Sequence, residues 1–388
     1  MNLELAPETA EYARELRRWS VEQLRPHARA ADRAHAVSAA AIEAYRSRPF
    51  TGSPNAGSIR VPALEGTTDG TYVIATTVVE HGTYGDSIFG CLDQTGIGAK
   101  VVRLIGSPEQ VERWGHTDGF TGFALTEPEA GSDAAGLRTS AVQDGDHWVL
   151  NGTKMFCSGG ALSEYVVVFA TVDRSLGYNG IRSFLVPADT PGFIVVKANE
   201  EKLGMRAMCT SLLAFDDVRV PDENCLGVPD SRPRAFGRAL ATLNTTRHQV
   251  ASIAVGLAQA AIDEARPLLQ AQKLSYTPAR WARIQADLAA MDAALHNGRL
   301  LIRNAAQLLD RGLPFSREAS IAKAAVPPLA ERIIARILRI LGPDGYSEEL
   351  LFEKWHRDVK IIDIWEGTGQ IQRRTISRSL MGSGAAAG

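Results

Sequence analysis

The stretch that organises the chain lies near its end, at residues 361–374, and reads I-I-D-I-W-E-G-T-G-Q-I-Q-R-R. An apolar run ends there in one carboxylate, Glu366, which is followed at once by the flexible Gly367. We expect Trp365 and the Ile residues before it to keep water away from Glu366. Desolvation raises the pKa of a carboxyl group, which suits a general base. Taken alone, the stretch is better explained as a first-turn helix glutamate beside the helix dipole.

Two upstream motifs change that balance. Residues 123–133 read F-A-L-T-E-P-E-A-G-S-D, and residues 151–160 read N-G-T-K-M-F-C-S-G-G. Together with W-E-G-T-G-Q-I-Q-R in the same order downstream, these motifs resemble the acyl-CoA dehydrogenase family of flavoenzymes. The resemblance is strong over residues 122–227 and again over residues 342–378, and it is weaker elsewhere.

Length and composition bound the class of protein. A chain of 388 residues with 45% hydrophobic and 22% charged residues is long enough for two or three globular domains. The net charge of −2 offers no basic field to nucleic acid or to a membrane surface. The four cysteines form no C-x-x-C pair and the eight histidines show no metal-ligand spacing, so we expect no disulfide framework and no metal. Without a signal peptide or a membrane-spanning apolar run, a cytoplasmic protein is expected.

The periodicity of apolar residues changes twice along the chain. It is helical over residues 1–118, alternates as in strands over residues 119–230, and returns to a helical period over residues 231–388. We therefore expect an α+β multidomain protein: an N-terminal helical domain, a middle antiparallel β domain of barrel type, and a C-terminal helical bundle. The resemblance implies the same order, with four helices in the last domain.

Local signals mark turns and helix breaks inside these segments. The D-G-D sequence at residues 144–146 and the N-G sequence at residues 151–152 are both typical of β-hairpins. Pro26 predicts the end or a kink of the first helix. The proline pair at residues 327–328 predicts a break or kink in a helix over residues 316–341.

The resemblance implies α,β-dehydrogenation of an acyl thioester. The α-hydrogen must leave as a proton and the β-hydrogen as a hydride, and the electron pair needs an acceptor that side chains do not supply. The resemblance implies FAD as this cofactor and Glu366 of the E-G-T motif as the base, with its backbone N–H donating to the thioester carbonyl. Some members take the base from the helix that carries Arg247, but Thr246 stands at that position, so Glu366 is our one candidate.

By the same resemblance, the cofactor contacts come from the three motifs. The predicted cofactor-binding residues are Phe123, Leu125, Thr126, Gly131, Ser132, Phe156, Ser158, Thr368 and Gln370. The predicted substrate-binding residues are Ser132, Asn244, Arg247 and Gly367. Each has a simpler structural alternative: without the following motif Thr126 is an ordinary strand threonine, Ser132 caps a turn, and Arg247 is a helix arginine.

Two segments depart from the family pattern. The family motif R-x-x-F-G, whose Arg binds the flavin pyrophosphate of a neighbouring subunit, aligns with Q-K-L-S-Y at residues 272–276. The family motif Q-x-x-G-G-x-G-Y appears as R-I-L-G-P-D-G-Y at residues 339–346. A partner subunit could supply the missing Arg, or Lys273 or Arg339 could replace it. The divergence also leaves open an acyl chain on a carrier protein instead of CoA.

Two rival functions stay open at this point. A flavin-dependent monooxygenase on the same fold would have no need for Glu366. A partner subunit of a hetero-oligomeric acyl-CoA dehydrogenase, poor in FAD, would explain the lost partner-side residues. For the leading hypothesis the resemblance implies an electron-transferring flavoprotein or similar acceptor and a homo-oligomer, dimer or tetramer, with a hetero-oligomer as the alternative.

Overall fold

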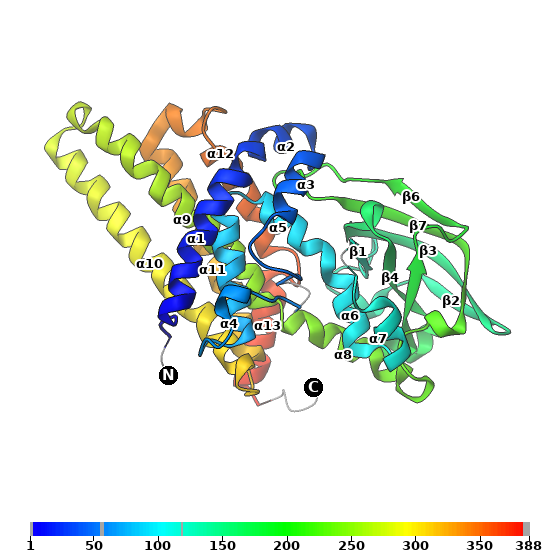
Figure 1. The fold of residues 1–388 in the computed structure, drawn as a ribbon. Coiled ribbons are helices and arrows are strands. Elements are labelled where there is room, and N and C mark those ends of the chain that lie inside the picture. The colour runs from blue at the N-terminus through cyan, green and yellow to red at the C-terminus, as the bar shows by residue number, and fades with distance from the viewer. Residues whose placement is uncertain (1–2, 55–57, 118, 383–388) are drawn as a thin grey trace.

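We describe the chain from a computed structural model, which defines residues 3–54, 58–117 and 119–382. Helices occupy both ends of the chain and a β-sheet occupies its middle (Figure 1). In Figure 1 the sheet lies to the right, and the N-terminal helices pack along the long C-terminal helices. This order confirms the predicted fold class.

The N-terminal part is helical. Its helices within the described ranges are α1 (Pro7–Gln23), α2 (Ala28–Ala34), α3 (Ala39–Arg46), α4 (Thr71–Thr83), α5 (Ile88–Asp93), α6 (Ile97–Ile105) and α7 (Pro108–Trp114). A single 3₁₀ turn at Arg25–His27 separates α1 from α2, so the break predicted at Pro26 is confirmed. The first turns of α6 are buried on every side, including the side chain of Lys100.

The middle part is a seven-stranded sheet. Its strands are β1 (Thr121–Ala124), β2 (Ser140–Asp144), β3 (His147–Ser158), β4 (Tyr165–Thr171), β5 (Ile181–Pro187), β6 (Phe193–Lys197) and β7 (Thr210–Pro221). Their order is β1-β4-β2-β3-β7-β6, with β5 paired to the other side of β4. Most pairs are antiparallel as expected, but β1 runs parallel to β4. The hairpin predicted at residues 144–146 joins β2 to β3.

The second predicted hairpin, at Asn151-Gly152, is wrong. β3 continues through both residues, and its register against β7 shifts between Leu150 and Gly152, which is the mark of a β-bulge. Gly152 has φ of +151°, and a Cβ there would lie 2.5 Å from Thr139 Oγ1. The same N-G pair can form a bulge or a turn, and the pairing of β3 with β7 decides between them.

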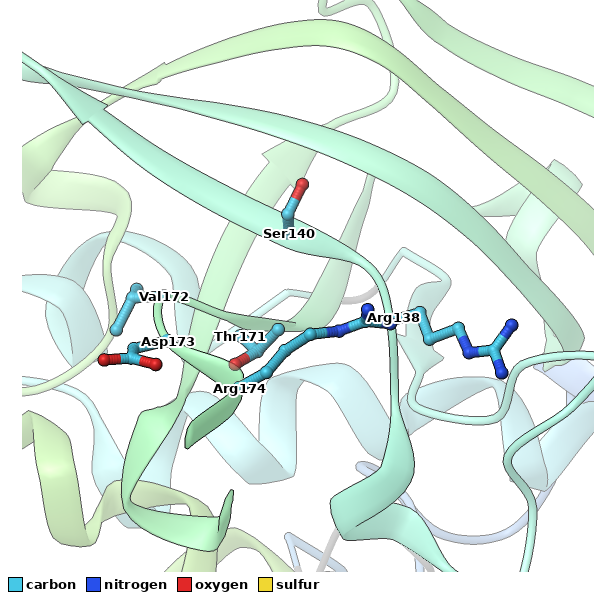
Figure 2. A pocket seen from close by; sticks show the side chains of 6 residues that line it. All are labelled: Arg138, Ser140, Thr171, Val172, Asp173 and Arg174. Atoms are coloured by element: carbon cyan, nitrogen blue, oxygen red, sulfur yellow. The ribbon is translucent and has the colours of Figure 1, made fainter. Parts of the chain in front are cut away.

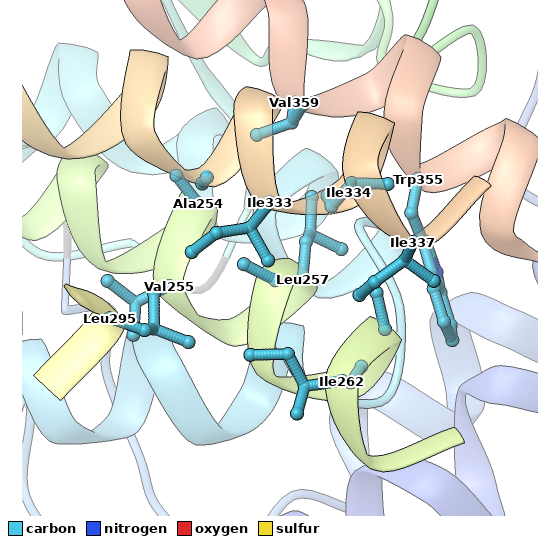
Figure 3. Close-up of a cluster of buried hydrophobic side chains, with 14 of the residues drawn as sticks. Ala254, Val255, Leu257, Ile262, Leu295, Ile333, Ile334, Ile337, Trp355 and Val359 are labelled. Carbon is cyan, nitrogen blue, oxygen red and sulfur yellow. The ribbon is translucent and has the colours of Figure 1, made fainter. Parts of the chain in front are cut away.

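The C-terminal part is a helical bundle. Its helices are α8 (Arg232–Asn244), α9 (Arg247–Ala271), α10 (Pro278–Asp310), α11 (Ser316–Leu341), α12 (Phe352–Val359) and α13 (Gly369–Leu380). Figure 3 shows the apolar core between α9, α10 and α11, where Leu257, Leu295 and Ile334 are fully buried. The predicted domain boundaries fall between α7 and β1 and between β7 and α8, and they stay our proposal for the domain limits.

The break predicted at residues 327–328 does not occur. α11 runs from Ser316 to Leu341 with both prolines inside it. Pro327 is buried next to Val326 in the bundle core, where α11 packs against α9 and α10. The packing of the apolar face outweighs the lost backbone hydrogen bonds, as tertiary contacts commonly override local preference.

Buried charges join the three parts directly upstream of the Glu366 loop. Lys354 Nζ on α12 lies 2.9 Å from the Asp86 carboxylate of the N-terminal part and 2.6 Å from Asp358 Oδ2. The other oxygen of Asp358 accepts the backbone N–H of Met205, which follows β6, at 2.5 Å. All three charged side chains are at most 3% exposed. This network fixes the segment from which residues 360–368 extend.

Candidate active site

Glu366 lies in a loop between a 3₁₀ turn at Lys360–Asp363 and the start of α13. Its φ is +50°, a left-handed conformation that is uncommon for residues other than glycine and often found at functional sites. Gly367 follows at φ +93°, and a Cβ there would lie 2.7 Å from Gln372 Nε2. Thr368 is the N-cap of α13, and its hydroxyl accepts the N–H of Ile371. Glu366 therefore precedes the helix and is not a first-turn glutamate.

The two oxygens of the Glu366 carboxylate have different surroundings. Oε2 accepts a 2.6 Å hydrogen bond from Thr246 Oγ1, which lies just before α9. Oε1 is buried and meets no hydrogen-bond partner among the described residues. Burial raises the pKa of Glu366, while Thr246 and then the nearby cations lower it. Oε2 is thus fixed by a hydrogen bond, and Oε1 is available to interact with a ligand.

Buried cations lie near the Glu366 carboxylate in addition to the apolar run that precedes it. Of the Ile residues in that run, Ile362 is fully buried, whereas Ile364 is 48% exposed. Lys100 of α6 and Lys323 of α11 are 4% and 0% exposed, and each interacts electrostatically with Glu366. Burial lowers the pKa of each lysine to about 8. Arg247 completes the set, with its pKa lowered by burial and raised in part by Glu366.

The predicted substrate residues divide into two groups. Arg247 and Gly367 lie together at Glu366, since a Cβ on Gly367 would be 3.8 Å from Arg247 Nη2. Asn244 is the last residue of α8, directly before the turn that carries Thr246. Ser132 is exposed in the loop after β1, on the β domain. Their roles toward substrate stay predictions.

The predicted cofactor residues of the β domain gather at the ends of β1 and β3. The backbone N–H of Met155 donates to Thr126 O at 2.8 Å and so joins the two segments. Phe156 is 55% exposed and has φ of +58°, so an aromatic ring is presented to solvent from a strained backbone. Thr126 and Ser158 are half-buried beside it, while Gly131 is exposed.

The remaining predicted cofactor residues have structural partners already. Phe123 packs on Phe169 with ring centroids 5.1 Å apart, and Leu125 packs against the same core cluster. Thr368 caps α13, and Gln370 is exposed in the first turn of that helix. Any cofactor contact at Phe123 or Leu125 therefore involves the backbone or the part of the side chain left uncovered.

With this geometry in view, comparison with known proteins identifies the family. The family model of the acyl-CoA dehydrogenase middle domain matches residues 122–218, and the model of the C-terminal domain matches residues 236–381. The mitochondrial short-chain specific acyl-CoA dehydrogenase of Bos taurus is 42% identical over 283 residues, which are 72% of this chain and 68% of that protein. The chain belongs to the acyl-CoA dehydrogenase family.

Two further comparisons agree. The subunit CarC of the caffeyl-CoA reductase-Etf complex of Acetobacterium woodii is 38% identical over 284 residues, 72% of this chain and 74% of that protein. The butyryl-CoA dehydrogenase structure from Megasphaera elsdenii superposes with a TM-score of 0.87 at 28% identity, over 98% of this chain and all of the other. As a family member, the protein is a flavoprotein oxidoreductase acting on the CH–CH group of acyl-CoA, with FAD as its cofactor.

The structure explains why two motifs of this acyl-CoA dehydrogenase occur together. Glu127 of T-E-P and Lys154 of N-G-x-K form an ion pair at 2.7 Å, with 6% and 0% of their side chains exposed. Glu127 also accepts the N–H of Arg138 and both the N–H and hydroxyl of Thr139. Lys154 donates further to Leu125 O at 3.0 Å. Both residues lie inside the quoted motifs, but the sequence analysis did not predict this ion pair, which we call the Glu127–Lys154 clamp.

The two segments that depart from the family pattern are neighbours in space. Gln272 Nε2 donates to Asp344 Oδ2 at 2.7 Å, which joins the two loops. Lys273 lies over the Trp281 ring at 5.8 Å, and Leu274 beside it is 99% exposed. The two divergent loops are therefore in direct contact, and Lys273 has an aromatic partner within the chain.

Two surface pockets are lined by residues other than Glu366. One pocket of about 350 Å³ is on the β domain and is lined by Arg138, Ser140 and residues 171–174 (Figure 2). A second, of about 400 Å³, is lined by residues of α9 and α10. Neither includes a predicted site residue. Within the described chain, no helix is long and apolar enough to cross a bilayer, and no cluster of three metal-ligating side chains is present.

Thr246→Val is expected to shift the pH dependence of the reaction. The predicted base, Glu366, would act only when ionised, so activity should fall as the pH drops through its raised pKa. Removing the Thr246 hydroxyl removes a donor to the anion, a bond of the kind worth about 1.5–3 kcal/mol. The acidic limb of kcat/KM should move to higher pH, with full rates recovered well above it. Thr245→Val, one residue earlier, is the control, and an unchanged limb in Thr246→Val would contradict the assignment.

Proposed function

We propose that this chain catalyses the FAD-dependent α,β-dehydrogenation of an acyl thioester, with Glu366 as the base that removes the α-proton. One observation carries the proposal: Thr246 holds one oxygen of the Glu366 carboxylate at 2.6 Å, and the other is buried without a hydrogen-bond partner in the described chain. A buried carboxylate costs stability unless it is satisfied, and a free oxygen of this kind is typical of a group that receives a proton.

The surroundings of Glu366 suit both halves of a proton transfer. Burial raises its pKa, so the carboxyl can keep a proton once it has taken one. Thr246 and the cations Lys100, Lys323 and Arg247 act in the opposite direction and favour the ionised form that must take the proton. The backbone N–H of Glu366 would donate to the thioester carbonyl as enolate charge develops there. FAD, when bound, supplies the acceptor for the β-hydride.

The residues around the ends of β1 and β3 fit a flavin ring. The exposed Phe156 ring and the half-buried hydroxyls of Thr126 and Ser158 offer an aromatic edge and hydrogen-bonding groups on one side. Trp365, next to the base, has a buried indole N–H without a partner in the described chain. The unpartnered buried indole N–H on the Glu366 loop and the exposed Phe156 ring on the β domain both support a bound ligand.

Further features remain proposals of the same kind. Coenzyme A is the proposed carrier, although an acyl-carrier protein would meet the same chemistry. An electron-transferring flavoprotein is the proposed acceptor, supported by the relative that is named as part of an Etf complex. We propose a homo-oligomer in the cytoplasm, with a hetero-oligomer as the alternative where a partner subunit supplies the flavin-pyrophosphate arginine.

Anaerobic titration of the purified protein with straight-chain acyl-CoAs tests the proposed function. We expect the yellow flavin absorbance to bleach with about one equivalent of a suitable acyl-CoA and to return on reoxidation. The monooxygenase alternative predicts that acyl-CoA does not bleach the flavin under anaerobic conditions. In air, it predicts oxygen consumption by the reduced flavin. The partner-subunit alternative predicts a colourless chain that turns yellow only when a related subunit is co-expressed.

A further inference from the structure

We infer that the acyl group of the substrate carries an anionic substituent, a carboxylate being the simplest, and that Lys100 together with His248 and Gln249 binds it near the reacting carbons. This rests on the proposed function, because it concerns the substrate of the same site. The inference makes Lys100 a specificity-determining residue, distinct from the base and from the residues of the three motifs.

Lys100 is the first observation. It sits in the first turn of α6, a buried segment at the centre of the molecule, and its side chain is 4% exposed. Its ammonium group has no hydrogen-bond partner in the part of the chain that the structure describes. A buried ammonium without a partner is expensive, and such groups are kept where a ligand completes them.

The second observation is a pair of side chains on the first turn of α9. His248 and Gln249 are 0% and 1% exposed. Both ring nitrogens of His248 and both amide atoms of Gln249 lack partners among the described residues. Lys100 is close enough for its charge to act on His248, and burial together with that charge lowers the pKa of His248 to about 3. A neutral imidazole and an amide can both donate beside the ammonium.

Existing carboxylates do not satisfy Lys100. Glu366 and, more weakly, Asp93 attract its charge, but the free oxygen of Glu366 and the Lys100 ammonium are each without a hydrogen bond, so they form no direct ion pair. Asp93 accepts instead from the Ser53 hydroxyl at 2.7 Å. Lys323 and Arg247 add positive charge around Glu366, and Asp363 adds a second carboxylate.

The chemistry of the missing group follows from this set. A buried ammonium without a hydrogen-bond partner in the described chain, together with two neutral polar side chains, suits a carboxylate, which can accept from several donors at once. The group must belong to a short acyl chain, because Lys100 lies within the field of the base and the base must reach the α-carbon. Short acyl-CoAs that end in a carboxylate are therefore the substrate class that the site fits best.

Matched substrate pairs test this inference. Succinyl-, glutaryl- and adipyl-CoA would be compared with valeryl-, hexanoyl- and heptanoyl-CoA by anaerobic flavin bleaching. The wild-type protein should prefer the carboxylated member of at least one pair. Lys100→Met should lower kcat/KM for that member by about 10- to 100-fold more than for its apolar counterpart, as expected for a lost hydrogen bond to a charged group. The effect of the lost charge on the Glu366 pKa is common to both members, so the ratio of the two kcat/KM values is the measurement. Lys197→Met, on the distant β6, should change neither.

Binding measurements keep the test independent of turnover. Calorimetric titration of the Glu366→Gln protein with the same pairs should show tighter binding of the carboxylated member, and adding Lys100→Met or Lys100→Gln should remove that preference. A preference for the apolar member in every pair, or an equal loss for both members in Lys100→Met, would overturn the inference. Bleaching by apolar acyl-CoAs alone would support the dehydrogenase function and overturn the carboxylated substrate class. Preferential binding of the carboxylated members without any bleaching would support the substrate class and overturn the dehydrogenase function.

Discussion

Glu366→Gln is expected to lower the rate of flavin reduction by an acyl-CoA by about 10²- to 10⁴-fold, the range that a positioned general base contributes. The amide keeps the shape of the side chain and its contact with Thr246, but it cannot take the α-proton at the oxygen that is now free. Rapid-mixing absorbance of the bound flavin under anaerobic conditions is the measurement. The loss should be in the reductive step and not in the content of FAD.

Two controls sharpen this result. Glu112→Gln, on the exposed surface of α7, should leave the reductive rate unchanged. Thr246 Oγ1 lies 2.6 Å from the Glu366 carboxylate, so a glutamate at position 246, just before α9, would place its carboxylate close to the position of the lost one. Thr246→Glu in the Glu366→Gln background should therefore restore part of the rate. Flavin reduction at the wild-type rate in Glu366→Gln alone would remove Glu366 from the mechanism.

Lys154→Met should lower the free energy of unfolding by about 3–5 kcal/mol, because it leaves Glu127 as an uncompensated buried charge. Burial by itself raises the pKa of Glu127, and Lys154 with the Thr139 hydrogen bonds brings it below its ordinary value. Without Lys154 the carboxylate is left buried without its countercharge. Since the clamp joins the loop of Thr126 to β3, the variant should also release FAD more readily. Urea denaturation and flavin fluorescence measure the two effects.

The matched control for this variant is Lys197→Met. Lys197 pairs with Glu200 at 2.9 Å, but its side chain is 42% exposed and solvent screens the pair, so the loss of stability should be far smaller than for Lys154→Met. The double variant Lys154→Met/Glu127→Gln removes both charges and keeps a carbonyl oxygen for the backbone donors. It should lose less than the sum of the single variants. Additive losses would show that the two charges do not depend on each other.

Local patterns were sufficient for the order of helices and strands. The change of apolar period near residues 119 and 231 reflects which face of each segment is buried, and that is encoded residue by residue. The same local signals gave a wrong turn at Gly152 and suggested a helix break at the prolines of α11 that does not occur. At Gly152 the choice between turn and bulge depends on β7, and at Pro327 the helix is retained by its packing in the bundle.

The sequence by itself determined the family, the cofactor and the candidate base. Each of the three motifs is an uninterrupted stretch of residues, so its residue types and their spacing are enough to identify it. Only the tertiary structure decided the partners of that base. Thr246 forms a hydrogen bond with Glu366, which is 120 residues away in the sequence. Lys100 acts on Glu366 electrostatically from a helix that carries none of the motifs. The physical reason is that a polar side chain shows its residue type in the sequence, whereas its unsatisfied hydrogen-bonding atoms exist only once distant helices have packed around it.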